Sequence, residues 1–287
     1  MDAPIPGTSG RGTVGGMSDH GFSFGVVLTP RGSGRDWVAA VRASERQGWN
    51  SLLVPDTLRT PSPFPTLAAA AAATSTLQLR TWVLAGPLRS PAAVVREASA
   101  LQALSDGRFE LGIGTGRPDA EREAERLGVP WGSTADRIRQ VEQVIADVRE
   151  QVRPAPRVMI AAAGPRMLAA AGRVADRIGL ALPPQATEQD LSTAVDRARA
   201  VPPQHIALTQ QLVGLAGRLP SWLTGQGGGS LDHVPLAATG AVGMLTGDAT
   251  EMADTLVRRR ETLGIDEYVV AGELAEDFAP VIGALSG

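Results

Sequence analysis

Apolar residues recur along the chain in two patterns, short segments in which they are adjacent or alternate and longer stripes with helical spacing. The short runs predict strands at 24–28, 51–54, 77–84, 109–113, 157–161, 177–181, 206–213 and 268–270. The stripes between them predict helices, and capping signals such as Ser33 with Asp36 and Ser90 before Pro91 mark helix starts. Strands that alternate with helices predict parallel strands joined by helical crossovers.

Eight such strand and helix units follow one another from Phe22 to Gly287. This number predicts an α/β fold of the (β/α)8 TIM-barrel type, with residues 22–287 as a single domain. An open doubly wound sheet is the alternative, but the GxGxxG fingerprint that follows the first strand of many such folds is missing. Residues 214–245 are predicted to be an irregular insert, and the glycine-rich residues 1–21 a disordered leader.

Composition narrows the classes of partner and chemistry. The 287 residues are 43% hydrophobic and 20% charged, which suits a globular protein with a large core. A formal net charge of −3 gives no basic field for nucleic acid, and no run is long and apolar enough for a membrane span. The leader has no apolar secretory segment, so we expect a cytoplasmic protein. Cysteine is absent, and with His20, His205 and His233 as the only imidazoles we expect no metal site.

The stretch 105–116 is the most informative part of the sequence. A turn at 106–107 leads into a strand with apolar residues at every second position, 109–113. Gly112, Gly114 and Gly116 then allow another backbone or a ligand to come close where the strand ends. Because active sites of parallel barrels lie at the C-terminal ends of the strands, this strand end predicts a binding surface.

A second strand end has the composition of an anion site. Ala161–Arg166 leads a strand into a helix through small residues, which leaves backbone amides exposed and adds the charge of Arg166. A phosphate group would fit there. The alternative is that the small residues only allow the helix to pack tightly on the barrel.

Several segments together resemble one family. Gly107–Gly116, with the sequence GRFELGIGTG, resembles the GRF-LG-G-G signature of the luciferase-like, deazaflavin (F420)-dependent oxidoreductases. Further segments resemble the same family in the same order: Arg89–Pro91, Ile160–Arg166, Ala175–Asp176 and Thr246–Val270. The compact length of the chain is similar to that of proteins in a short actinobacterial branch of the family. The resemblance implies a TIM barrel of the bacterial luciferase-like type.

The resemblance also implies a cofactor ring, of F420 or alternatively of FMN, across the mouth of the barrel. Leu84, Ala85 and Gly86 would back the ring, at a position where the family often has a bulge or a non-proline cis peptide. Thr115 and Gly116 would line the ring or its ribityl chain. The phosphate would be held by five consecutive residues: Ala162, Ala163, Gly164, Pro165 and Arg166.

The sequence departs from the family pattern where a proton donor is expected. The family commonly has Asp-His after the second strand, whereas this chain has Asp56–Thr57. The first strand ends with Thr29 instead of an acidic or aromatic residue. Asp56, Thr57 and Thr29 are therefore the candidate catalytic residues, beside a substrate group or water. For Asp56 the alternative is a cap on the loop before Arg59.

Two arginines and two tryptophans each allow two interpretations. Arg89 and Arg117 either meet the acidic tail of F420 or an anionic substrate, or they are surface charges. Trp131 and Trp222 either wall the pocket or cover the core.

We therefore predict an enzyme, an F420-dependent oxidoreductase that acts as a reductase. It would transfer a hydride between the deazaflavin and an activated C=C or C=N bond of a small-molecule or peptide metabolite. An FMN-dependent luciferase-like monooxygenase is the first alternative, and a catalytically silent cofactor-binding protein is the second. By analogy with the family we expect a homodimer, with helices at 67–73 and from Ser90 as candidate contacts.

Overall fold

The computed structural model describes residues 21–200, 206–224, 236 and 240–285. The predicted leader, apart from Gly21, and the three histidines lie outside the described residues. The domain boundaries therefore stay a prediction.

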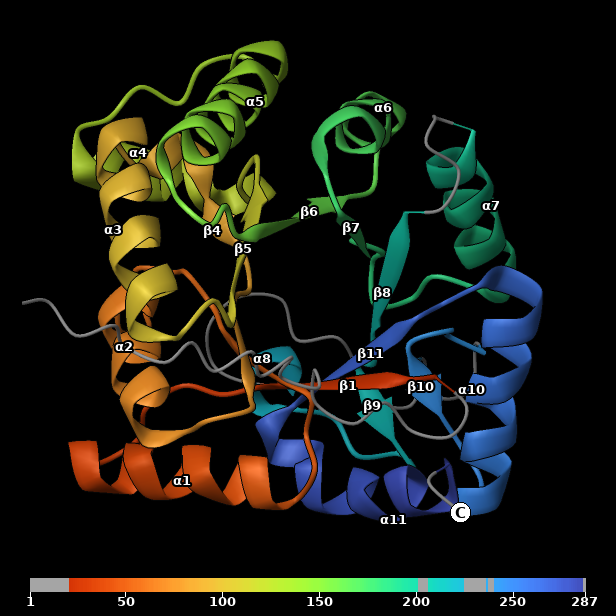
Figure 1. Cartoon of the computed structure of the whole chain (residues 1–287). Helices are drawn as coiled ribbons and strands as arrows, with labels where there is room; N and C mark the ends of the chain where they lie inside the picture. The colour runs from red at the N-terminus through yellow and green to blue at the C-terminus, as the bar shows by residue number, and fades with distance from the viewer. Residues whose placement is uncertain (1–20, 201–205, 225–235, 237–239, 286–287) are drawn as a thin grey trace, which may run out of the picture.

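Parallel strands form a closed barrel (Figure 1). In sheet order the strands are β3 (Gln78–Thr81), β2 (Ser51–Val54), β1 (Ser23–Val27), β11 (Glu267–Ala271), β8 (Ala207–Gln211), β7 (Arg177–Leu180), β6 (Arg157–Ala162), β5 (Phe109–Gly114) and β4 (Leu84–Ala85). Pairing of β3 with β5 closes the ring. Since β3 and β4 are two segments of one interrupted strand, eight strands surround the barrel axis, and the predicted (β/α)8 barrel is confirmed.

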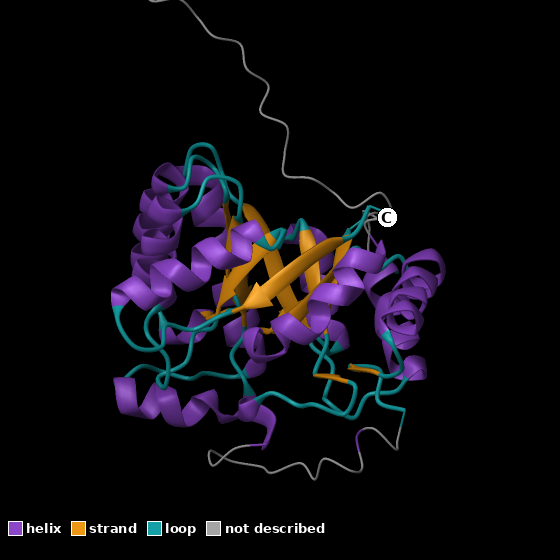
Figure 2. Ribbon diagram, turned by 90° about the horizontal axis from the view of Figure 1, so that it is seen from below, coloured by secondary structure: helices purple, strands orange, loops and turns teal. Residues whose placement is uncertain are grey.

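Helices surround the strands, as the view from below shows (Figure 2). The outer helices are α1 (Gly34–Arg46), α2 (Pro63–Ala73), α3 (Pro91–Leu104), α5 (Thr134–Gln151), α6 (Pro165–Val174), α7 (Glu188–Arg199), α10 (Ala249–Leu263) and α11 (Ala275–Leu285). Shorter turns follow three of the strands: η1 (Gly86–Leu88), η2 (Pro118–Ala120) with α4 (Glu121–Leu127), and η3 (Gly272–Leu274). The predicted capping box of Ser33 and Asp36 is present, whereas Ser90 precedes Pro91 without a side-chain capping bond.

The predicted strand at 77–84 is interrupted. β3 ends at Thr81 and β4 begins at Leu84, with a non-proline cis peptide between Trp82 and Val83. The Thr81 hydroxyl lies against Gly112 of β5, donating to its carbonyl at 2.7 Å and accepting from its amide at 3.0 Å. The bulge expected at Leu84–Gly86 thus lies two residues earlier, because the side chain of Thr81 takes the place of a ladder bond.

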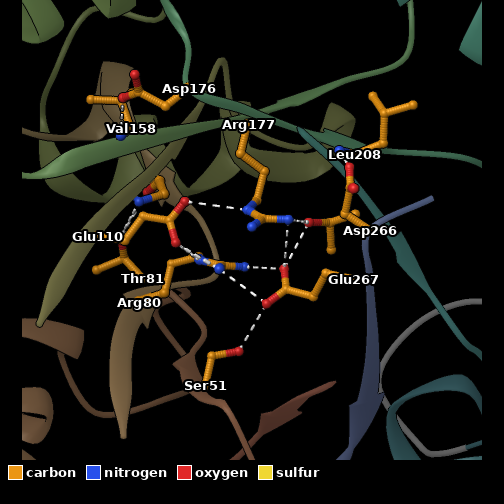
Figure 3. Close-up of polar contacts among 12 residues, drawn as sticks. Ser51, Arg80, Thr81, Glu110, Val158, Asp176, Arg177, Leu208, Asp266 and Glu267 are labelled. Atoms are coloured by element: carbon orange, nitrogen blue, oxygen red, sulfur yellow. Dashed lines mark hydrogen bonds and ion pairs between the residues drawn. The ribbon is translucent and has the colours of Figure 1, made fainter. Parts of the chain in front are cut away.

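Charged side chains from four strands meet inside the barrel, near the N-terminal ends of the strands (Figure 3). Arg80 lies 2.6 Å from Glu110 and 2.6 Å from Glu267. Arg177 lies 3.6 Å from each of the same two carboxylates. Burial by itself raises the pKa of Glu267, but Arg80 and Arg177 overcome it and lower that pKa to about 2. Two positive and two negative groups therefore balance in the core.

The region 214–245 contains more regular structure than predicted. Within its described part, β9 (Gly214–Leu215) pairs with β10 (Met244–Leu245), and α8 (Ser221–Thr224) lies between them in the chain. Ser221 donates through its amide and hydroxyl, both at 2.6 Å, to Glu273 of η3. These bonds fix α8 beside the end of β11. Across the described residues, no helix has the length and apolar character of a membrane span.

Candidate active site

The C-terminal ends of the barrel strands define the mouth of the barrel, because the barrel strands all run parallel. The predicted site residues all follow or end such strands. They are Thr29 after β1, Asp56 and Thr57 after β2, Leu84, Ala85 and Gly86 at β4, Thr115 and Gly116 after β5, and Ala162 to Arg166 after β6. The structure therefore gathers them at one end of the molecule.

Asp56 is held by an ion pair. Arg89 donates to its carboxylate through Nε at 2.8 Å and through a terminal nitrogen at 2.6 Å. The amide of Ala85 donates to the same group at 3.3 Å. Burial lowers the pKa of Arg89, but the bond and the charge of Asp56 outweigh this and raise it. The carboxylate thus ties the loop after β2 to β4, in place of the cap that the sequence suggested before Arg59.

The two threonines differ in what binds their hydroxyls. Thr57 closes its own turn, since its oxygen accepts from the amide of Arg59 at 3.1 Å and lies 3.2 Å from the Thr60 hydroxyl. Thr29 is half-buried, and the described residues offer its hydroxyl no hydrogen bond. Of the three candidate catalytic side chains, Thr29 is thus the one left available to a ligand.

Arg117 is a partly exposed charge that pairs with two carboxylates of its own loop. It lies 3.0 Å from Asp119 and 2.8 Å from Glu123. Burial lowers the pKa of Arg117, but these two carboxylates more than compensate and raise it. Its charge is therefore neutralised within the loop that follows β5.

The glycines of β5 make room for the protein's own chain. A Cβ on Gly112 would lie 1.9 Å from the Thr81 carbonyl oxygen, and one on Gly114 would lie 3.2 Å from Val83. A Cβ on Gly116 would lie 2.5 Å from the indole of Trp131. The first two positions accept the bend between β3 and β4, and the third accepts Trp131.

The loop after β6 is open to solvent. Ala162 is buried at the end of the strand, whereas Ala163, Gly164, Pro165 and Arg166 are exposed. Gly164 is the N-cap of α6 and provides no side-chain capping bond, and a Cβ there would meet nothing within 4 Å. Pro165, the first residue of α6, has no N–H, so the amides that lack a capping side chain at this helix start are those of Arg166 and Met167, beside the charge of Arg166.

A cavity of about 420 Å³ lies beside this loop. Its wall is formed by residues of the loop, of the segment after β7 and of α7: Ala163, Leu182, Pro183, Gln185, Ala186, Asp190, Thr193, Ala194 and Arg197. The cavity thus borders the β6 side of the mouth, apart from Asp56 and Thr29.

A comparison of the sequence with family profiles identifies the family of the chain. The profile of the luciferase-like monooxygenases matches residues 20–214. The chain belongs to this family. The F420-dependent glucose-6-phosphate dehydrogenase of Beutenbergia cavernae is 36% identical over 121 residues, which are 39% of this chain and 35% of that enzyme. An uncharacterized protein of Mycobacterium tuberculosis is 32% identical over 143 residues, 40% of this chain and 41% of the relative. The matches thus span less than half of these relatives.

Solved structures share the luciferase-like fold over nearly the whole chain. The F420-dependent tetrahydromethanopterin reductase of Methanopyrus kandleri superposes with a TM-score of 0.68 at 17% identity, covering 92% of this chain and 96% of that one. A type II Baeyer-Villiger monooxygenase of Pseudomonas putida, solved in complex with FMN, superposes with a TM-score of 0.67 at 13% identity. It covers 92% of this chain and 96% of its own. Both likenesses establish the fold of this luciferase-like protein.

Two features of the site have no clear signal in the sequence. The partnership of Asp56 with Arg89 joins segments that are 33 residues apart, and no spacing rule connects them. The contact of Trp131 with Gly116 depends on how the segment between them folds back. A glycine at a strand end indicates that something comes close, but not what it is.

Proposed function

We propose that this luciferase-like protein is an F420-dependent oxidoreductase. It would transfer a hydride between the deazaflavin and an activated C=C or C=N bond of a small-molecule or peptide metabolite. The observation that supports this most is the start of α6, where an exposed loop and a helix N-terminus without a capping side chain adjoin Arg166 at the mouth of the barrel. F420-dependent relatives support the choice of ring. FMN is the alternative, favoured by the neighbour solved with it.

The residues present fit a cofactor with a planar ring and a phosphate. Exposed amides and Arg166 suit a phosphate, because helix N-termini favour negative charge. Thr115 and Gly116 are half-buried and would line the ring, while Leu84, Ala85 and Gly86 are buried on the β4 side of β5 and would back it. When bound, the ring supplies the hydride chemistry, and the protein supplies position and electrostatics.

The protein's own polar groups then have separate tasks. Asp56 orients the β4 segment through Arg89 and the Ala85 amide. The hydroxyl of Thr29 donates a hydrogen bond to the substrate, or relays a proton from water. Thr57 stabilises the turn that follows Asp56.

Substitution of Arg166 tests the phosphate assignment. We expect Arg166→Ala to weaken F420 binding about tenfold at low salt, since a charged hydrogen bond contributes about 1.5–3 kcal/mol. Fluorescence titration of F420 measures this. Arg173→Ala is the matched control, because Arg173 lies in the last turn of the same helix and pairs with Glu142 at 2.7 Å. Equal affinity of the Arg166 variant and the wild type would contradict the assignment.

We also propose a homodimer. Helices α2 and α3 are described throughout, and their exposed charges are Arg96 and the Glu97 side chain, which is 42% exposed. Exposed apolar positions on the two helices are Pro65, Ala69, Ala72, Ala92, Ala93, Ala100, Ala103 and Leu104. An exposed apolar face of this kind suits a second copy of the chain.

A further inference from the structure

The segment between α4 and α5 brings an aromatic side chain to the mouth of the barrel. Gly116, two residues after β5, has a φ of +85°. A Cβ on it would lie 2.5 Å from Cη2 and 3.1 Å from Cζ3 of Trp131. Glycine is therefore required there twice, by the backbone and by the indole. The six-membered ring of Trp131 therefore packs against the chain just after β5.

A cation holds the indole from another side. The guanidinium of Arg137 lies 4.4 Å from the ring centroid of Trp131. Arg137 is itself fixed, donating to the carbonyl of Gly132 at 2.9 Å and to the Thr134 hydroxyl at 3.3 Å. These partners belong to the start of α5, which a capping box stabilises. Trp131 is thus clamped between a strand end and a helix start.

The clamped ring is only half-buried, unlike the core residues Trp37 and Trp49. Since α5 follows β5 and returns along the outside of the barrel, its N-terminus lies at the mouth end. Trp131 is therefore partly exposed near the mouth and contacts Gly116, the residue after Thr115. A rigid aromatic surface at such a place loses little conformational entropy when a ligand contacts it.

We infer that Trp131 is a ligand-contacting residue that stacks on a planar conjugated ring held at the end of β5. The inference rests on the proposed function, because that ring is the redox cofactor. The indole offers an electron-rich face, and the ring of a deazaflavin or flavin is conjugated and electron-poor. Arg137 and Gly116 are positioning residues, since they act only by fixing the indole.

Binding of F420 and, separately, of FMN to purified Trp131 variants tests the inference. We expect Trp131→Leu to weaken binding of the preferred cofactor about threefold to tenfold, in line with stacking contributions, and to raise the fluorescence of the bound ring because indole quenching is lost. Trp131→Phe should restore much of the affinity. Trp222→Leu is the matched control, because Trp222 is 55% exposed on α8, beside β11 and across the barrel from β5.

A second variant guards against misfolding of the first. Arg137→Gln keeps the indole but removes the cation that positions it, and we expect this looser indole to weaken binding about twofold with unchanged circular dichroism. If both variants bind the cofactor as tightly as the wild type, with equal quenching, Trp131 is not a ligand contact, while the proposed function stands. If the wild type binds neither F420 nor FMN, the proposed function fails and this inference fails with it.

Discussion

At the scale of single residues, the mouth of the barrel is organised by contacts between segments distant in sequence. Asp56 follows β2, Arg89 follows η1, and their bidentate bond also brings in the amide of Ala85. The carboxylate is thereby occupied by partners that any protonation role would have to displace. We therefore regard Asp56 as a positioning residue.

A double-mutant cycle tests this role. We expect Asp56→Asn and Arg89→Gln each to lower the free energy of unfolding by about 2 kcal/mol, because each leaves a largely buried polar partner behind. The double variant should lose less than the sum, with a coupling of about 1 kcal/mol. Urea unfolding measures all four proteins. Additive losses would show that the two side chains do not act together.

Gly112 offers a second test at this scale. Alanine there would place Cβ 1.9 Å from the Thr81 carbonyl oxygen, which is backbone and cannot move aside cheaply. We expect Gly112→Ala to lower the unfolding free energy by about 3 kcal/mol or more. Gly34→Ala is the control, since a Cβ on Gly34 meets nothing within 4 Å. A thermal melt of Gly112→Ala that matches the wild type would refute the close approach.

At the scale of elements, sequence patterns predicted most of the barrel. The alternation of apolar runs and stripes predicted the barrel strands and outer helices, because each strand is buried on both faces and each helix on one. The pattern did not predict the break of 77–84, since the apolar run continues through Trp82 and Val83. Only the approach of Thr81 to Gly112, 31 residues later on another strand, distinguishes this run from a straight strand.

The sequence predicted where the candidate site residues lie, but not which groups they contact. Parallel topology places each strand end at the mouth, so Thr29, Asp56 and Thr115 could be named from the sequence alone. Whether the Thr29 or the Thr57 hydroxyl is available to a ligand depends on the turn after Asp56. In that turn the Thr57 hydroxyl is bonded to Arg59 and Thr60. These hydrogen-bond partners depend on side-chain geometry, which the spacing of residues in the sequence does not determine.

The apolar faces of α2 and α3 lead to a prediction about assembly. We expect the protein to be a dimer in solution, and Leu104→Glu to shift it toward monomer by placing a charge on the shared face. Leu104 is 61% exposed on α3. Leu127→Glu is the control, since Leu127 is 46% exposed on another helix, α4. Light scattering after gel filtration measures the molar mass of the wild type and of both variants. A monomeric wild type would exclude the dimer.

At the scale of the whole molecule, the barrel separates a charged floor from the mouth. The floor consists of Arg80, Glu110, Arg177 and Glu267, which cross-link four strands near their N-terminal ends. The proposed ligand contacts all lie at the opposite ends of the strands. The floor therefore stabilises the scaffold, while the loops at the mouth determine the chemistry.

The floor predicts how stability depends on pH. Glu267 has a folded pKa of about 2, below its ordinary value of 4.5. A lowered pKa stabilises the fold above the ordinary value, so stability should fall as pH drops from about 4.5 to 2. Glu267→Gln should flatten this part of the profile and cost about 3–5 kcal/mol at pH 7, because Arg80 and Arg177 lose a buried partner.

Urea unfolding at a series of pH values measures this dependence. Glu261→Gln, on the exposed side of α10, is the control and should follow the wild-type profile. A Glu267→Gln profile with the full wild-type slope between pH 4.5 and 2 would show that the floor does not control acid stability.

The proposed function depends on the binding of F420 by this luciferase-like protein. Fluorescence titration of the purified wild-type protein with F420, and separately with FMN, tests it most directly. We expect saturable binding of F420 to the site that includes Arg166, with FMN binding weaker. Saturable binding of FMN with no binding of F420 would contradict the proposed function.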